Sequence, residues 1–141
     1  MIVGDGPDGS AYKRYAKENL LRYEFTGKQP SQCYFRKAPL FIMSSAQEGW
    51  GLVITEAQQM GCVPIVLNTF PSASDIIQNG QNGFLVDGMN EFQKKLRFLM
   101  VDINIRNQIA ENAIMDSIRF SPERIQLKWN TLMTLKVNNK G

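Results

Sequence analysis

The sequence predicts one α/β domain in which helices cover a doubly wound parallel sheet. Short segments that are apolar throughout alternate with longer segments whose apolar residues recur at helical spacing. Strands that are apolar on both faces have to be covered on both faces, and a parallel sheet with helical crossovers provides that cover. A length of 141 residues and a hydrophobic fraction of 43% suit a single domain with its own core.

The predicted elements follow one another in a regular order along the chain. We expect strands at residues 1–3, 23–26, 40–43, 63–67 and 83–86. We expect helices at residues 10–21, 31–37, 51–60, 91–100, 103–117 and 122–135. Because the first strand begins at residue 1, whereas an α/β domain normally has a lead-in, we expect further sequence upstream in the complete protein.

Two helix ends carry chemical markers. Gly61 follows the periodic segment 51–60, where a glycine after the helix C-terminus is expected. Ser121 and Pro122 place an N-cap and a first-position proline before Glu123 at the start of the last helix.

The composition excludes several classes of chemistry. The chain has no histidine, so a Ser-His-Asp triad, a Cys-His dyad and an HExxH zinc site are all excluded within it. Cys33 and Cys62 are too few for a zinc knuckle and are not spaced as a CxxC centre, so we expect two free, buried thiols in a reducing cytoplasm. The net charge of +3 is spread along the chain, which argues against nucleic acid as the partner. No apolar run reaches the roughly 18 residues of a membrane span, and no signal-peptide pattern is present, so we expect a cytoplasmic protein.

A glycine-rich loop at residues 4–9 fits the pattern GxGxxG between a strand and a helix. This pattern is the fingerprint of dinucleotide binding. However, Pro7 removes one N–H donor from the loop, and the acidic ribose partner would have to be Glu24, which lies inside a predicted strand. We therefore interpret the loop as a turn in which Gly4 allows close approach of a neighbouring backbone. The alternative interpretation, an NAD-binding site, is supported by this motif alone.

The segment 48–56 combines charge, turn chemistry and helix geometry. Glu48 and Glu56, with seven residues between them, lie on either side of a glycine turn that opens an apolar helix. Glu48 lies near the carboxyl end of strand 40–43, where open α/β sheets bind ligands, and the glycines permit a tight turn. The N–H groups of the first helical turn suit a diphosphate. In the alternative interpretation, Glu48 caps the helix and Glu56 is solvated or pairs with a lysine.

Together with its neighbours, this segment resembles the EX7E element of retaining glycosyltransferases of the GT-B fold, in particular glycosyltransferase family 4. The family pattern is a strand ending in Ser, then Glu-Gly-Phe-Gly-Leu, Glu-Ala and Gly-x-Pro-Val-Ile. The matching residues here are Ser45, Glu-Gly-Trp-Gly-Leu at 48–52, Glu-Ala at 56–57 and Gly-Cys-Val-Pro-Ile-Val at 61–66, with further matches at 2–7, 25–27, 75–86 and 120–125. The resemblance implies that residues 1–141 form a single Rossmann-like nucleotide-sugar-binding domain, the C-terminal half of a GT-B fold without its first βα unit.

The resemblance also implies a role for each site residue. Glu48 is the expected catalytic residue and would bind hydroxyl groups of the donor sugar, and Glu56 would bind the ribose hydroxyls. The other expected donor-binding residues are Gly49, Trp50, Gly51 and Leu52, around the diphosphate and sugar, and Gly4, Thr26 and Lys28, of which the last two flank the base pocket. A carboxylate that accepts two hydroxyl donors orients a diol tightly, and helix N-terminal donors stabilise charge on a leaving diphosphate. No metal and no cofactor is expected.

Departures from the family pattern limit what the chain could do alone. An Arg and a Lys that neutralise the diphosphate in the family lie upstream of this sequence, as does the acceptor domain. The family's Gly-Gly before Glu-Ile-Ile is replaced by Pro-Ser-Ala-Ser at 71–74 with Asp75. We therefore expect the donor-binding half of a larger two-domain enzyme, inactive by itself and with weak affinity for a nucleoside diphosphate.

The resemblance further implies the partners of the full-length enzyme. These are a nucleotide-diphosphate sugar, a saccharide or glycolipid acceptor, and the membrane surface as a peripheral attachment, within polysaccharide biosynthesis. A sheet edge exposed by the missing strand would favour a homodimer. The rival interpretations are a nucleotide-binding module without transfer activity and a small NAD-dependent oxidoreductase, which lacks a Tyr-x-x-x-Lys pair.

Overall fold

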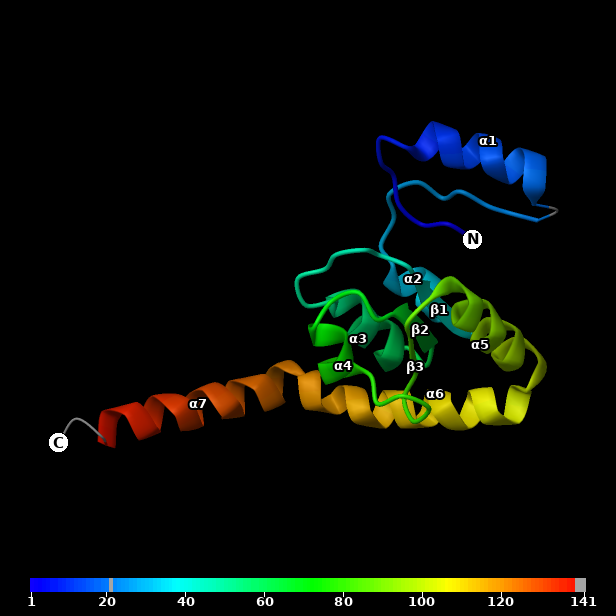
Figure 1. Cartoon of the computed structure of the whole chain (residues 1–141). Coiled ribbons are helices and arrows are strands. Elements are labelled where there is room, and N and C mark those ends of the chain that lie inside the picture. Colours follow the sequence, from blue (N-terminus) through cyan, green and yellow to red (C-terminus); the bar gives the residue numbers. More distant parts are fainter. Residues whose placement is uncertain (21, 139–141) are drawn as a thin grey trace. The chain divides into compact units, whose positions relative to one another are not determined.

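The structure is a computed structural model that describes residues 1–20 and 22–138 (Figure 1). The chain divides into two compact units, Met1–Tyr34 and Phe35–Gly141, which we call the N-terminal and C-terminal units. The boundary falls within the short helix α2 (Gln32–Phe35).

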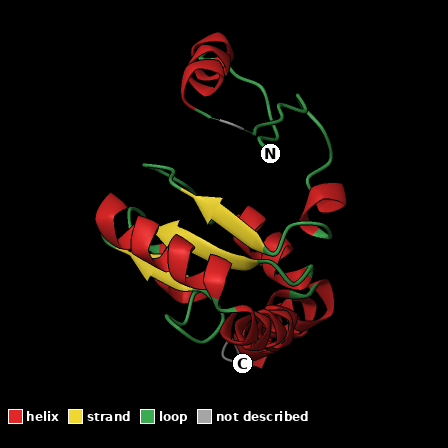
Figure 2. Cartoon of the chain, turned by 90° about the vertical axis from the view of Figure 1, so that its right-hand side faces the viewer, coloured by secondary structure: helices red, strands yellow, loops and turns green. Residues whose placement is uncertain are grey.

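The C-terminal unit is built on a parallel three-stranded sheet (Figure 2). Its strands are β1 (Leu40–Met43), β2 (Val63–Leu67) and β3 (Phe84–Val86), in the spatial order β1-β2-β3. Ile42 pairs with Ile65, and Val66 pairs with Leu85. The predicted strands at 40–43 and 63–67 are confirmed, and the one predicted at 83–86 begins one residue later.

Helices connect the strands and follow them (Figure 1). In chain order they are α3 (Leu52–Gln59), α4 (Ser72–Ile76), α5 (Met89–Val101), α6 (Ile103–Ser117), the 3₁₀ turn η1 (Ile118–Phe120) and α7 (Pro122–Asn138). The longer predicted helices are confirmed to within a few residues at their ends. The sequence did not predict α4 or η1, because segments of five and three residues are too short to show a helical period.

The central strand β2 supplies side chains to cores on both faces of the sheet. Val63 and Ile65 pack with α5 and α6, in a cluster that includes Phe92, Leu99 and Ile109. Val66 points to the opposite face and packs with α3 and α4, in a cluster that includes Ile54, Phe70 and Ile76. The alternation is the period of two of a strand. It confirms the prediction of a doubly wound sheet covered on both faces.

The N-terminal unit contains α1 (Gly9–Asn19) and two paired segments that are not strands. Ile2 forms a parallel bridge with Phe25, and the N–H of Ile2 donates to Glu24 O at 2.7 Å. The prediction of strands at 1–3 and 23–26 was therefore wrong in extent. Within this unit the two segments pair only with each other among the described residues, and two strands alone rarely gain enough burial to extend. Ile2 is accordingly 41% exposed.

The helix ends follow the sequence markers. Gly61 adopts a φ of +78°, its N–H donates to Gln58 O, and the N–H of Cys62 donates to Ala57 O, which is the Schellman pattern. At α7, the hydroxyl of Ser121 accepts from the N–H of Arg124. A side-chain hydrogen bond with Ser121, and a further one with its own backbone, hold the pKa of Glu123 below its usual value. Both predicted markers are confirmed.

Close approach of β2 and β3 makes Gly83 intolerant of a side chain. A Cβ atom there would lie 2.9 Å from Pro64 O and 2.6 Å from Pro64 Cγ. We expect Gly83→Ala to lower the free energy of unfolding by about 1–3 kcal/mol, because the two strands would have to separate. Urea denaturation measures the change. Gly88→Ala is the matched control, since nothing lies within 4 Å of its Cβ position, and an equal loss in both variants would contradict the assignment.

The two thiols should differ sharply in reactivity. Burial raises the pKa of Cys62 from 9.0 to about 11, and its sulfur lies 2.9 Å from Ala38 O and 3.1 Å from Phe35 O. Cys33 is exposed, so the prediction of two buried thiols was wrong for this residue. A thiol-specific chromogenic reagent at pH 8 should therefore label Cys33 rapidly and Cys62 only after denaturation. The protonated thiol of Cys62 stabilises the folded state below pH 9, and that contribution is lost as the pH rises towards 11. Rapid labelling of Cys62→Ser but not of Cys33→Ser would confirm the assignment; the reverse would contradict it.

Candidate functional site

The turn between β1 and α3 requires a glycine at its last position. Gly51 is the N-cap of α3 and has a φ of +82°, a conformation that side chains with a Cβ rarely adopt. A Cβ at this position would also lie 3.0 Å from Ile54 Cδ1 and 3.3 Å from Phe70 Cε2. The helix start is therefore fixed in both conformation and space.

This turn places the start of a helix at the carboxyl end of the sheet. The first intrahelical bond runs from the N–H of Ile54 to Gly51 O at 2.9 Å. The N–H groups of Leu52 and Val53 precede that bond, and first-turn N–H groups have no acceptor within their own helix. They form the positive end of α3, which has eight residues and is long enough to favour an anion at that end.

The two glutamates of the segment occupy different environments. Glu48 is exposed in the turn. Glu56 is half-buried on α3, and it is not without an interaction partner. The N-cap residue of α3 is Gly51, which has no side chain with which to cap the helix. Glu48 is therefore not the N-cap residue, and the roles expected for the two glutamates remain predictions.

Glu48 and Gly49 line a cavity of about 600 Å³. Its other lining residues are Gln47 from the same turn and three residues that follow β2, namely Thr69, Phe70 and Pro71. The cavity thus lies where the carboxyl ends of β1 and β2 meet. Its volume falls in the range of small-molecule sites, about 300–1,000 Å³.

Thr69 and Phe70 were not among the site residues predicted from the sequence. The signal that could have found them is topological, because the loops after neighbouring parallel strands meet at one edge of the sheet. Residues 71–74 had been noted only as a departure from the family pattern. In the structure, Pro71 lines the cavity and the next residue begins α4.

Side-chain hydrogen bonds tie the two loops together. The hydroxyl of Thr69 donates to Ser45 O at 2.6 Å, and the hydroxyl of Ser72 donates to Gly49 O at 3.1 Å. Phe70, which is buried, packs beside Gly51. The turn that carries Glu48 is therefore held at three points by the segment after β2.

Trp50 and Leu52 are both exposed, and the sequence analysis placed both in the donor site. The indole of Trp50 packs edge-to-face on Phe120, with ring centroids 6.2 Å apart and an interplanar angle of 74°. Neither residue is among those that line the cavity, so their assignment to the donor site remains a prediction.

The remaining predicted residues, Gly4, Thr26 and Lys28, belong to the N-terminal unit. Gly4 has a φ of +127°, and its N–H donates to Gly27 O at 2.8 Å. The N–H of Thr26 donates to Ile2 O at 3.1 Å, and Lys28 is exposed. A second cavity, of about 310 Å³, lies in this unit; its lining includes the glycine loop, Phe25 and Lys13. The structure therefore brings Gly4 and Thr26 together at one end of the paired segments.

Two features of the described residues bear on metal binding and on membranes. Within residues 1–20 and 22–138, no cluster of three or more His, Cys, Asp or Glu side chains could hold a metal ion. In the same part of the chain, no helix is long and apolar enough to cross a membrane.

The sequence matches the model of one protein family. That family is described as glycosyl transferases group 1, and the match extends over residues 1–116. The chain belongs to this family. The fold is accordingly the C-terminal half of a GT-B glycosyltransferase, with the parallel sheet and the β1–α3 turn described above.

Members of the family with curated names are similar over most of this chain. The amylovoran biosynthesis glycosyltransferase AmsD of Erwinia amylovora is 27% identical over 139 residues, which is 94% of this chain and 39% of AmsD. An α-1,4-N-acetyl-D-galactosaminyltransferase of Campylobacter jejuni that acts on an undecaprenol-linked saccharide is 25% identical over 94% of this chain and 38% of the enzyme. The chain thus spans about two fifths of the length of these relatives.

Solved structures show the same fold. HepE of Anabaena, in complex with UDP and glucose, superposes with a TM-score of 0.77 at 23% identity, over 96% of this chain and 39% of HepE. The C-terminal domain of LpcC of Francisella tularensis, a glycosyl transferase group 1 family protein, superposes with a TM-score of 0.66 at 24% identity, over 79% of this chain and 63% of that chain.

The backbone of the turn distinguishes its two glycines. Gly51→Ala should destabilise the fold by about 2 kcal/mol, because it forces a left-handed residue and a close contact with Ile54. Gly49→Ala, in the same turn, should change the free energy of unfolding by less than about 0.5 kcal/mol, since nothing lies within 4 Å of its Cβ position. Chemical denaturation of both variants tests the pair, and equal losses would show that the left-handed turn does not control stability.

Proposed function

We propose that this chain is the donor-binding half of a retaining glycosyltransferase of family 4. The observation that carries the proposal is the cavity in which Glu48 meets a glycine turn at the N-terminus of α3, beside the loop after β2. This arrangement offers a carboxylate for hydroxyl groups and backbone donors for a diphosphate within one site.

Each group has a defined task in the proposal. Glu48 is the catalytic residue that binds hydroxyl groups of the donor sugar, and Glu56 binds the ribose hydroxyls. The backbone of Gly49, Trp50, Gly51 and Leu52 contacts the diphosphate and sugar, where N–H groups stabilise negative charge as the sugar leaves. The base lies near residues 26–28, with Gly4 beside them.

The electrostatics of the cavity explain why the isolated chain would bind weakly. Its lining contains one carboxylate and no cationic side chain, so only helix and backbone dipoles oppose the charge of a diphosphate. Such dipoles contribute about 0.3–1 kcal/mol each when exposed. We propose that the chain alone does not catalyse transfer and that donor binding needs no metal.

The similar proteins support the wider proposal. AmsD is named for amylovoran biosynthesis, and HepE has been crystallised with UDP and glucose. We infer a saccharide or glycolipid acceptor held by a further domain, peripheral attachment to a membrane from the cytoplasmic side, and a role in polysaccharide biosynthesis. Pairing of two chains through a sheet edge is part of the same proposal and is tested by sedimentation.

Titration of UDP, GDP and their sugars into the chain tests donor binding. We expect one nucleotide sugar to bind in the high micromolar to millimolar range, and we expect Glu56→Gln to weaken it by at least about tenfold, because one charged hydrogen bond contributes roughly 1.5–3 kcal/mol. Glu48→Gln should reduce the difference between the sugar nucleotide and the free nucleotide, since Glu48 contacts only the sugar.

The control for both variants is Glu111→Gln, which makes the same chemical change on the exposed face of α6. Binding should persist in EDTA. Tight binding of NAD, or affinity that Glu56→Gln leaves unchanged, would overturn the proposal. Donor binding without transfer by the full-length protein would favour a nucleotide-binding module.

A further inference from the structure

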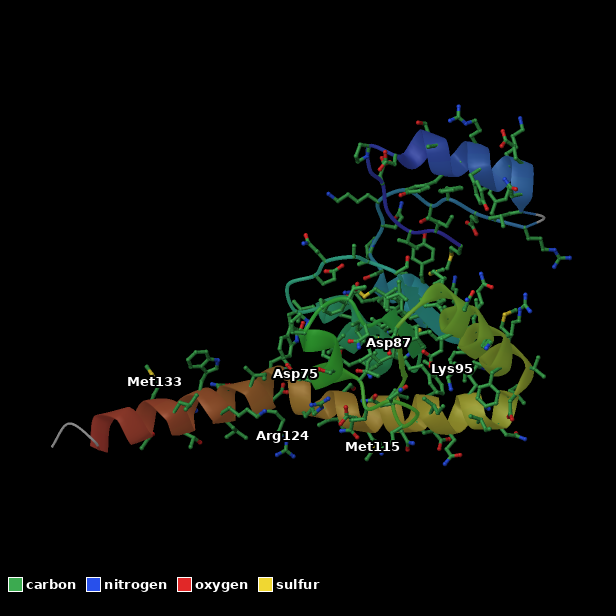
Figure 3. The ribbon with its side chains drawn as sticks, viewed as in Figure 1. Asp75, Asp87, Lys95, Met115, Arg124 and Met133 are labelled. Carbon is green, nitrogen blue, oxygen red and sulfur yellow. The ribbon has the colours of Figure 1, made fainter. Side chains whose placement is uncertain are left out.

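A polar network lies behind the candidate site, around Arg119 of η1. Its Nε donates to Asp116 Oδ2 at 3.0 Å, and its Nη2 donates to Asp75 O at 2.8 Å and to Ile76 O at 3.0 Å. The guanidinium therefore binds two carbonyl groups at the C-terminal end of α4. No N–H group within so short a helix can donate to these carbonyls. Figure 3 labels Asp75 on α4 and Arg124 near the start of α7, the helix that follows η1.

The position of Arg119 is itself fixed by the core. Asp116 also accepts from Asn82 Nδ2 at 2.6 Å, and Asn82 is 1% exposed. The same amide nitrogen donates to Ile76 O at 3.0 Å, and Asn82 Oδ1 accepts from the N–H of Gln78 at 2.8 Å. Because every polar atom of the Asn82 side chain is engaged, the network has one geometry rather than several.

One route from Arg119 to the site runs through α4. This helix has five residues, and Arg119 binds the carbonyls at its C-terminal end. At its other end, the hydroxyl of Ser72 donates to Gly49 O, and Pro71, just before the helix, lines the cavity. A displacement of α4 would thus move the lining of the cavity and the turn that carries Glu48.

A second route runs through Phe120. The guanidinium carbon of Arg119 lies 4.2 Å from the centroid of the Phe120 ring, and this ring contacts the indole of Trp50 edge-to-face. Phe120 also packs against the core cluster that contains Ile54 and Phe70. Arg119 therefore helps to fix the ring on which Trp50 rests.

We propose that Arg119 is a positioning residue for the candidate site. It holds Gly49 through α4 and Trp50 through Phe120, and it touches neither donor nor acceptor. Lysine cannot replace it, because a single ammonium cannot present the planar fork that binds Asp116 and two carbonyls at once. The ligand-binding consequence rests on the proposed function, whereas the structural consequence does not.

The experiment uses the indole of Trp50 as the reporter. The chain has two tryptophans, so Trp129→Phe, on exposed α7, leaves Trp50 as the only tryptophan, whose emission is excited selectively at wavelengths that tyrosine does not absorb. In that background we compare Arg119→Gln, Arg119→Lys and the control Arg106→Gln. Arg106 is also half-buried and donates to a backbone carbonyl, Leu99 O at 3.0 Å, but lies at the junction of α5 and α6.

Three readouts separate positioning from general stabilisation. They are acrylamide quenching of Trp50, the amide NMR shifts of residues 49–52, and the affinity for the nucleotide sugar that binds the parent chain. For Arg119→Gln we expect more efficient quenching, shifted amides and an affinity loss of about 2- to 30-fold, the range for a residue that acts on a site without touching its ligand. Arg119→Lys should recover only part of each, and Arg106→Gln should match the parent.

Each outcome decides the inference. Unchanged quenching and amide shifts in folded Arg119→Gln would overturn it, as would equal changes in Arg106→Gln. If the parent binds no nucleotide sugar, the proposed function fails, but the first two readouts still test positioning. Should Arg119→Gln not fold, Phe120→Leu takes its place: it keeps the hydrogen bonds of Arg119 and removes the ring under Trp50, so unchanged quenching there would also overturn the inference.

Discussion

Parallel pairing of β2 with a strand on each side is the constraint on which the candidate site depends. Parallel strands end at the same edge of the sheet, so the loops after β1 and β2 have to meet there. The first four residues of β2 are buried, and their side chains anchor both cores. The hydrogen bonds from Thr69 to Ser45 and from Ser72 to Gly49 then join the two loops. The site therefore forms where the two loops meet at this edge, and neither loop would form it alone.

The chemistry of the site is that of fixed dipoles beside a carboxylate. Gly51 ends the turn in a left-handed conformation, and this sets where the free N–H groups of α3 begin. Donors fixed in this way need no reorganisation when charge develops on a ligand, which is why preorganised sites are effective. In the proposed function, the C-terminal unit contributes this element to the donor site.

The sequence alone was sufficient to predict the elements that show a clear hydrophobic pattern or a marker residue at their ends. Strands that are apolar on both faces, the Schellman glycine Gly61 and the cap Ser121 all act locally, and the structure follows them. The helix α4 and the role of Thr69 were missed, because five residues show no period and the contact of Thr69 with Ser45 spans 24 residues. The segments at 1–3 and 23–26 were overextended, since strand propensity does not by itself supply neighbours.

The segment that separates Glu48 from Glu56 contains two kinds of structure. Residues 49–51 belong to the turn and residues 52–56 to α3, so the two parts respond differently to insertions and deletions. One residue added within the helix before Glu56 would rotate that side chain by about 100° around the helix axis and change its direction relative to Glu48. One residue added in the turn would leave the direction of Glu56 intact and displace only Glu48. A change in turn length and a change in helix length would therefore disturb different members of the pair.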